Sequence, residues 1–346
     1  MERKTPDIKA QEQMRAHWDA LAKPLGSLGQ LEEMTIRLAG IQGGMPYVHP
    51  RAVAVFAADN GILEEGFNPV PQAVTAAQFN NMAKGVAGIS VLCEKTGAGL
   101  TLVDVGIASD CAHPAILKKK VAYGTKNMAK GPAMTREQAQ AAFDAGVETA
   151  HMLAAQGNRI IGIGEMGIGN TSTSSAVISL LCGVSPEETT GRGVGLDDTM
   201  HQLKIDAIKR AIDVNKPEAD DPMDVLSKVG GLDIAAMAGC YAGAAQEGVA
   251  CVVDGLISMA AALCAVRLQP DVQAFLFASH ASSEPGYIVA CRELGLKPVL
   301  ALDMRLGEGS GCPLLFMLLD AAVVLFKKMA RLDTTGLEIE DLIDIR

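Results

Sequence analysis

The sequence predicts an α/β fold, with a mostly parallel, Rossmann-like sheet, helices on both faces, and a small helical domain built from the termini. Six short apolar runs alternate with segments of helix length and end near Gly, Ser or Asp. They are residues 52–57, 100–105, 159–163, 248–253, 274–277 and 299–302. Buried strands of this length, separated by helices, are typical of βα units in a parallel sheet.

The chain length predicts more than one structural unit. Its 346 residues exceed what one compact core usually holds, and helical periodicity occurs near the N-terminus in residues 6–22 and 28–42. The polar, acidic segment 334–346 indicates a closing helix. We therefore expect a small helical domain from residues 1–45 and 328–346, and a large Rossmann-like domain from residues 46–327.

Charge and hydropathy exclude several classes of protein. The formal charge of −10 argues against a nucleic-acid-binding surface, which requires a basic stripe. The longest apolar stretch, residues 312–326, contains Asp320 and is too short to span a membrane. The polar N-terminal residues lack the apolar core of a signal peptide. We expect a cytoplasmic protein that binds neither nucleic acid nor membrane.

The cysteines and histidines indicate neither disulfides nor a metal site. The eight cysteines and six histidines are dispersed, and no Cys-x-x-Cys, His-x-His or His-x-x-x-His spacing occurs. Zinc sites and disulfide frameworks usually show such spacing. We expect buried thiols and no bound metal.

Glu308 is an isolated carboxylate among glycines, in Leu-Gly-Glu-Gly-Ser-Gly at residues 306–311. The apolar run 298–302 before it predicts a buried strand, and Pro313 suits a first helical position. A carboxylate at such a turn can face a ligand while the backbone approaches closely on both sides. The alternative is a solvated loop acid.

The glycine-rich segment 162–173 contains a G-x-G-x-x-G match. A dinucleotide-binding site also requires a second strand that ends in an acid about 20 residues later, and residues 182–187 indicate a loop there. The remaining pattern is a strand, a glycine turn and a hydroxyl-rich helix start at Asn170 or Thr171, which is typical of an anion site. Glu165 suits a cationic or hydrogen-donating part of a ligand. A tight turn that packs a helix on the sheet is the alternative.

Three further segments carry candidate ligand-binding residues. Lys204 follows the glycine-rich segment 191–199 and could neutralise a phosphate, or be an exposed helical lysine. Ser282 precedes a helix start at Pro285 and could bind phosphate or cap the helix. Gln78 could offer its amide to a heterocycle, or lie on the surface. Because the carboxyl ends of parallel strands share one edge of a sheet, we expect a single site there.

Seven segments together resemble one family. They are residues 23–29, 58–61, 71–78, 164–171, 191–193, 253–255 and 307–311. The chain resembles the nicotinate-nucleotide–dimethylbenzimidazole phosphoribosyltransferases from about residue 8 to residue 343. The resemblance implies transfer of the 5-phosphoribosyl group of nicotinate mononucleotide to 5,6-dimethylbenzimidazole, giving α-ribazole 5′-phosphate and nicotinate for the nucleotide loop of cobalamin. It also implies a homodimer, and no cofactor is expected.

The resemblance assigns roles residue by residue. Glu308 matches the catalytic base, Glu165 a second active-site acid, and Gln78 a position near the accepted base. Gly193, Lys204 and Ser282 match positions that contact phosphate and ribose. Beside these, Met166 and Leu306 flank the two acids and suit an apolar slot for the azole, and the shared sheet edge predicts that Gly164, Gly167, Asn170 and Thr171 also face the ribose phosphate.

Other functions remain open at this level. Asn60 stands where the family often has a histidine, and Val70 where some members have a serine near the base, so a different benzimidazole, a purine or a phenol could be the acceptor. A nicotinamide-cofactor dehydrogenase built on the glycine-rich segment is a second alternative. A non-catalytic nucleotide-binding protein is a third, which the pair Glu165 and Glu308 disfavours.

Overall fold

The computed structural model describes residues 4–193, 195–336 and 343–345. Their strands form one six-stranded sheet in the order β3-β2-β1-β4-β5-β6, and every neighbouring pair is parallel. The strands are β1 (Arg51–Ala58), β2 (Gly99–Gly106), β3 (Ile116–Lys118), β4 (Ile160–Met166), β5 (Ala250–Val253) and β6 (Leu276–Ala278). The predicted α/β fold class is confirmed.

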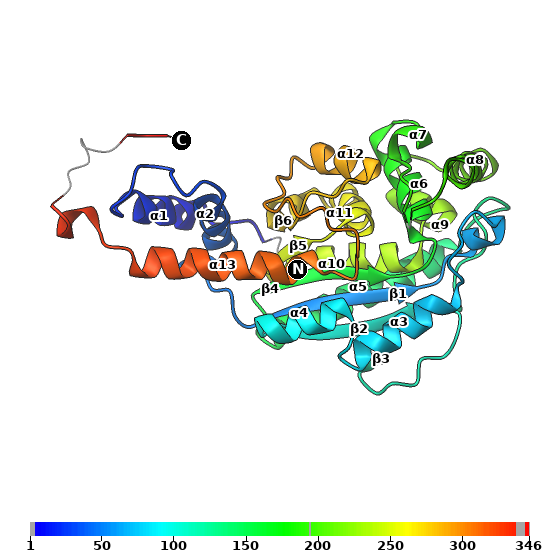
Figure 1. The fold of residues 1–346 in the computed structure, drawn as a ribbon, viewed down its shortest axis with the longest axis horizontal. Helices are drawn as coiled ribbons and strands as arrows, with labels where there is room; N and C mark the ends of the chain where they lie inside the picture. The colour runs from blue at the N-terminus through cyan, green and yellow to red at the C-terminus, as the bar shows by residue number, and fades with distance from the viewer. Residues whose placement is uncertain (1–3, 194, 337–342, 346) are drawn as a thin grey trace.

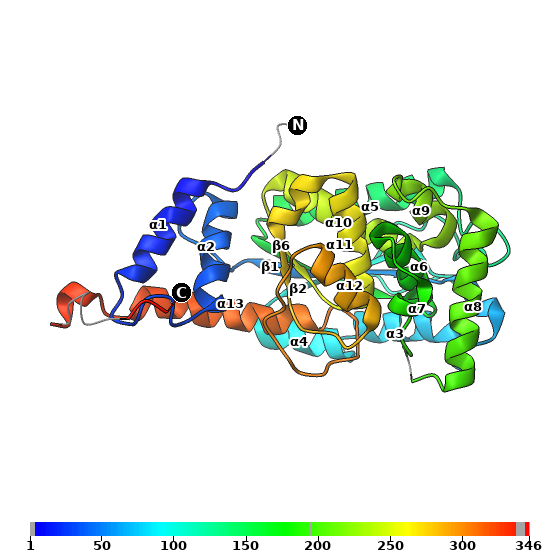
Figure 2. The same ribbon diagram turned by 90° about the horizontal axis from the view of Figure 1, so that it is seen from above.

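Helices cover both faces of the sheet. Figures 1 and 2 show α5 and α10 on one side of the strands and α3, α4 and α13 on the other. None of the described helices is long and apolar enough to cross a membrane. The α-helices are α1 (Ile8–Asp19), α2 (Gln30–Gln42), α3 (Ala73–Ala83), α4 (Gly88–Thr96), α5 (Arg136–Ala155), α6 (Asn170–Cys182), α7 (Pro186–Thr189), α8 (Asp198–Asn215), α9 (Pro222–Val229), α10 (Leu232–Glu247), α11 (Leu256–Leu268), α12 (Pro285–Glu293) and α13 (Gly311–Lys328); η1 (Gly61–Glu65), η2 (Pro270–Phe275) and η3 (Leu332–Thr334) are 3₁₀ helices.

A second hydrophobic cluster lies where α1 and α2 meet the end of α13, away from the sheet (Figure 1). Trp18 is fully buried there, its indole N–H donates to Thr35 Oγ1 at 2.8 Å, and Phe326 packs against its ring. The buried ion pair Lys23–Glu32, at 2.8 Å, closes the loop between α1 and α2. The helix α13 begins beside the sheet and ends in this cluster, so it belongs to both parts of the molecule. The division into a small domain (residues 1–45 and 328–346) and a large domain (residues 46–327) therefore stays a prediction.

Three sequence predictions of secondary structure are wrong in detail. The run 298–302 is not a buried strand, because the chain there makes one isolated bridge, from Leu300 to His280 just beyond β6, and then turns away through Asp303 with φ 51°. Pro313 is the third residue of α13, which begins at Gly311. In the predicted closing helix 334–346, the described residues 335, 336 and 343–345 are not helical, and residues 337–342 and 346 lie outside the described part. The short strand β3 had no clear sequence signal.

Glycines bring α5 and α10 into direct backbone contact. A Cβ added at Gly146 would lie 1.8 Å from Ala236 O, and one added at Gly239 would lie 1.9 Å from Phe143 O. No side chain fits at either position, so the two helices pack at the closest approach that backbones allow. Since α10 lies against the central strands, this contact supports the sheet below the strand ends.

We expect Gly146→Ala to lower the free energy of unfolding by about 1–3 kcal/mol, because the methyl group forces two helix backbones apart. Chemical denaturation monitored by circular dichroism measures this change. Gly44→Ala is the matched control, since a Cβ there would meet nothing within 4 Å. Equal stability of the two variants would contradict the packing argument.

Candidate active site

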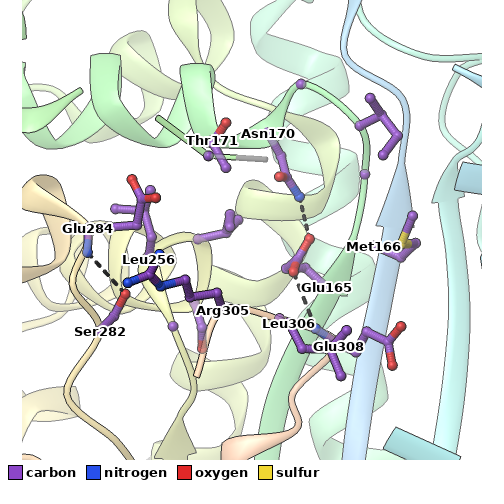
Figure 3. A pocket seen from close by; sticks show the side chains of 18 of the residues that line it. Glu165, Met166, Asn170, Thr171, Leu256, Ser282, Glu284, Arg305, Leu306 and Glu308 are labelled. Carbon is purple, nitrogen blue, oxygen red and sulfur yellow. Dashed lines mark hydrogen bonds between the residues drawn. The ribbon is translucent and has the colours of Figure 1, made fainter. Parts of the chain in front are cut away.

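A pocket of about 360 Å³ opens at the carboxyl ends of β4, β5 and β6. Met166 ends β4, Asp254 follows β5 and His280 follows β6, and all three line the pocket. The loop before α13 and the start of α6 complete the walls (Figure 3). This is the edge at which open α/β folds bind ligands.

Glu308 is a buried acid with two hydrogen-bond donors. Gln78 Nε2 donates to its Oε1 at 2.6 Å, and the backbone N–H of Ile89 donates to its Oε2 at 3.2 Å. Its backbone has φ 63°, between glycines that also have positive φ, and its exposure is 4%. Non-glycine residues in this region cost about 1–2 kcal/mol, so the surroundings must hold it there. The solvated-loop alternative is therefore wrong.

Asp254 holds the backbone on the far side of Glu308. Its Oδ2 accepts from Gly309 N at 3.1 Å and its Oδ1 from Gly311 N at 2.7 Å. The side chain is fully buried, and that burial raises the pKa of Asp254 to about 7 although both N–H groups favour the charged form. The sequence comparison marked residues 253–255 as a family segment but gave Asp254 no role. The structure makes it the anchor of the Glu308 loop.

Gly164 lies beneath this loop, not beside a ligand. A Cβ added there would lie 2.5 Å from Gly309 N, and Gly164 is absent from the residues that line the pocket. The prediction that Gly164 contacts phosphate is therefore wrong, because its missing side chain is what lets the loop approach β4.

Glu165 and Asp233 share one amide group. Asn170 Nδ2 donates to Glu165 Oε2 and, at 3.1 Å, to Asp233 Oδ2, while Glu308 N lies 3.4 Å from Glu165 Oε1 (Figure 3). Burial raises the pKa of Glu165 and raises that of Asp233 to about 7. The Asn170 side chain is thus directed at carboxylates, and its backbone N–H donates to Gly167 O at 3.2 Å, so neither group is free for the phosphate contact that we predicted.

Lys204 lies beside Thr171, which stands apart from Glu308 in Figure 3. Its Nζ donates to Thr171 Oγ1 at 3.0 Å and to Gly191 O at 3.2 Å, which leaves one of its three N–H groups for a ligand. Its exposure is 1%, so the exposed-lysine alternative is wrong. Burial lowers the pKa of Lys204 to about 8, and the charge of Glu284 opposes that change. Thr171 and Gly193 lie beside its ammonium group, and Ser282, whose Oγ accepts from Glu284 N at 3.3 Å, lines the same pocket.

The structure brings the other predicted residues to this one pocket. Those that line it are Gln78, Glu165, Met166, Gly167, Asn170, Thr171, Gly193, Lys204, Ser282, Leu306 and Glu308. Sequence reasoning missed Arg192, His280, Glu284 and Arg305, which also line it. Arg192 lies in the glycine-rich segment 191–199 but was given no role, and the other three lie in segments without a distinctive motif. Asn60 and Val70, the two departures from the family pattern, are not among the lining residues.

The glycines of the dinucleotide-type pattern serve packing. A Cβ at Gly162 would lie 2.5 Å from Cys312 Cβ at the start of α13, and one at Gly167 would lie 2.4 Å from Ala58 O. They let α13 and β1 approach β4 closely. The pattern therefore gives no support to a dehydrogenase.

We expect Asp254→Asn to speed amide hydrogen exchange at Gly309 or Gly311 by about 10- to 100-fold, because the two N–H groups bind different carboxylate oxygens and the NH2 group of Asn would replace one of these acceptors with a donor. Exchange measured by NMR or mass spectrometry on the folded protein tests this. Asp213→Asn, an exposed change on α8, is the control. Unchanged exchange at both glycines would show that Asp254 is not the anchor.

Comparisons with known proteins agree with this geometry. A family profile described as phosphoribosyltransferase matches residues 4–337. The nicotinate-nucleotide–dimethylbenzimidazole phosphoribosyltransferase of Clostridium tetani is 46% identical over 330 residues, covering 95% of this chain and 91% of that protein. Its namesake from Acetivibrio thermocellus is also 46% identical, with 92% of each chain covered.

A solved structure gives the same result. The crystal structure of the nicotinate-nucleotide–dimethylbenzimidazole phosphoribosyltransferase from Thermus thermophilus superposes with a TM-score of 0.90 at 38% identity, covering 96% of this chain and 99% of that one. Identity at this level over nearly the whole of each chain leaves no room for a different fold or family. The chain belongs to the nicotinate-nucleotide–dimethylbenzimidazole phosphoribosyltransferase family.

Proposed function

We propose that this pentosyltransferase moves the 5-phosphoribosyl group of nicotinate mononucleotide to 5,6-dimethylbenzimidazole, releasing α-ribazole 5′-phosphate and nicotinate for the nucleotide loop of cobalamin. One observation carries the proposal: the acids Glu165 and Glu308 and the buried Lys204 line a single pocket, and Thr171, which binds Lys204, stands apart from Glu308 in Figure 3. The donor has matching polarity, because its pyridinium ring is cationic and its phosphate is anionic.

Glu308 is the proposed general base. An azole nitrogen becomes more nucleophilic when a carboxylate accepts the N–H proton from the opposite ring nitrogen. The hydrogen bonds from Gln78 and Ile89 fix the orientation of the Glu308 carboxylate, and Met166 and Leu306 supply apolar walls beside it. The acid is thus held at the edge of a slot that suits a flat ring.

The remaining steps follow from the bonds exchanged. The azole nitrogen forms a bond to C1′ as the bond from C1′ to the pyridinium nitrogen breaks, and the electron pair leaves with nicotinate. Attack on the face opposite the leaving group converts the β-nucleotide into an α-riboside. Alignment of ring and ribose in one pocket supplies much of the acceleration in such reactions.

Lys204 and the start of α6 are the proposed phosphate site. The N-cap of α6 is Gly169, and no side chain caps this helix. The N–H groups of Asn170 and Ser172 donate to Gly167 O and Gly169 O, so that of Thr171 is the one among these three without a partner in the described residues. Such N–H groups and the helix dipole favour an anion. Thr171 Oγ1 and the backbone of Gly193 lie beside the Lys204 ammonium group, so phosphate oxygens can be shared among them.

The location, the oligomeric state and the domain division of the enzyme are also proposed. We place the enzyme in the cytoplasm as a homodimer, with a small helical domain from residues 1–45 and 328–346 and a catalytic domain from residues 46–327. The family resemblance and the separate cluster around Trp18 support these assignments.

The proposed reaction is tested by mass spectrometry of products from nicotinate mononucleotide and an equimolar mixture of 5,6-dimethylbenzimidazole, benzimidazole, adenine and phenol. We expect α-ribazole 5′-phosphate to be the main product. A main product from another base would change the assigned acceptor, and the absence of any riboside phosphate would refute the transfer.

Glu308→Gln should lower kcat by about 10²–10⁴-fold, the usual cost of removing a general base, while the melting temperature stays close to that of the wild type. The change keeps the length of the side chain and removes its ability to accept a proton. Steady-state kinetics and thermal denaturation provide the two measurements. A variant that retains more than about half of the wild-type kcat would rule out the base assignment.

The charge state of Lys204 should appear in the pH profile. Because burial lowers the pKa of Lys204 to about 8, its amine is charged below that pH and neutral above it, so kcat/KM for nicotinate mononucleotide should fall above about pH 8. Lys204→Ala should raise KM for the mononucleotide far more than KM for the benzimidazole and remove this limb of the profile. Lys209→Ala, on the same helix but outside the pocket, half-buried and paired with Glu187, is the control. Equal changes in both KM values would assign Lys204 a structural role.

A further inference from the structure

The pocket carries an excess of acidic groups. Glu165, Asp254, Glu284 and Glu308 all line it, and all but Glu284 are buried. The donor of the proposed reaction is itself anionic, since a phosphate carries about −1.5 to −2 and the ring carboxylate adds a further charge that the pyridinium only offsets. An acidic pocket can bind such a ligand only where cations are directed at its anionic groups.

Two of the three lining cations are already occupied by the protein. Arg192 donates from Nη1 to Leu196 O at 2.8 Å and pairs through Nη2 with Asp198. Lys204 donates to Thr171 and Gly191. Each therefore brings less than its full hydrogen-bonding capacity to a ligand.

Arg305 is different. It lines the pocket from the exposed loop that precedes Glu308, and within residues 4–193, 195–336 and 343–345 it has no hydrogen-bond or ion-pair partner. In Figure 3 its side chain points from that loop toward the part of the pocket where Ser282 and Glu284 lie. All five N–H donors of its guanidinium are available, in a planar fork that matches carboxylate and phosphate oxygens.

We propose that Arg305 is an anion-binding residue of the donor site, which recognises the carboxylate or the phosphate of nicotinate mononucleotide. This rests on the proposed function, since that function supplies the anionic donor. Arg305 lies one residue before Leu306 and three before Glu308 in the chain. The loop that binds the donor through the Arg305 guanidinium would therefore also carry Glu308, the proposed base, and Leu306, one wall of the azole slot.

Calorimetric titration of the purified enzyme with three donors, in the absence of any acceptor, tests the proposal. The donors are nicotinate mononucleotide, nicotinamide mononucleotide, which lacks the carboxylate, and nicotinate riboside, which lacks the phosphate. Arg305→Met should raise Kd for nicotinate mononucleotide by about 10- to 100-fold, as expected for the loss of a charge-assisted bidentate pair. Arg305→Lys should restore part of the affinity.

The effect must depend on the anion. If Arg305 binds the carboxylate, the penalty of Arg305→Met should largely vanish with nicotinamide mononucleotide; if it binds the phosphate, the penalty should largely vanish with nicotinate riboside. The same penalty for all three donors, or none for nicotinate mononucleotide, would overturn the proposal. Arg292→Met, an exposed arginine on α12 outside the pocket, is the matched control.

The titrations measure binding alone, so they test the role of Arg305 separately from the transfer reaction. A wild-type enzyme that binds nicotinate mononucleotide but forms no riboside phosphate with any base would refute the proposed function, while the three titrations would still decide the role of Arg305. Conversely, normal transfer with an Arg305→Met penalty equal for all donors would refute only the role of Arg305.

Discussion

The active site depends on a close contact between the Glu308 loop and the end of β4. Gly164 leaves the space, and Asp254 holds the loop in it through the backbone N–H groups of Gly309 and Gly311. That anchor helps to offset the cost of placing Glu308 in the left-handed region between two glycines, together with the hydrogen bonds that Gln78 and Ile89 donate to its carboxylate. The position of the proposed base therefore depends on a buried carboxylate in the loop that follows β5.

The site also concentrates negative charge where water is excluded. Glu165, Asp233 and Asp254 are buried near one another, and burial is the main cause of the raised pKa at each. Lys204 shows the complementary effect, because burial lowers its pKa. Groups in such a pocket respond strongly to ligand charge, since low solvent access leaves their interactions weakly screened. A zwitterionic donor that meets acids at its ring and cations at its anionic groups fits this arrangement.

The sequence was sufficient for the fold and for most of the pocket, because both follow from local patterns. Apolar runs that end in Gly, Ser or Asp located β1, β2, β4 and β5, and the rule that strand ends share one edge brought Glu165, Lys204, Ser282 and Glu308 to one site. Two glycines of similar sequence context then took different roles, since Gly167 lines the pocket and Gly164 lies under a loop. The two roles differ because the Glu308 loop crosses β4 at Gly164, and the sequence near these glycines does not show where a distant loop will pack.

Other features left no sequence signal for the same reason. The run 298–302 has strand composition, but the chain turns at Asp303 before it can pair over more than one residue. The role of Asp254 depends on a loop more than fifty residues later in the chain, and that of Arg305 on which side chains lie across the pocket.

The central claim is that Glu308 and Lys204 face opposite ends of one substrate. A crystal structure of the enzyme with α-ribazole 5′-phosphate tests it most directly. The account predicts phosphate oxygens within hydrogen-bonding distance of Lys204 Nζ, and the benzimidazole ring between Met166 and Leu306 with its unsubstituted nitrogen facing the Glu308 carboxylate. A ligand bound with its phosphate away from Lys204, or with its ring away from Glu308, would contradict it.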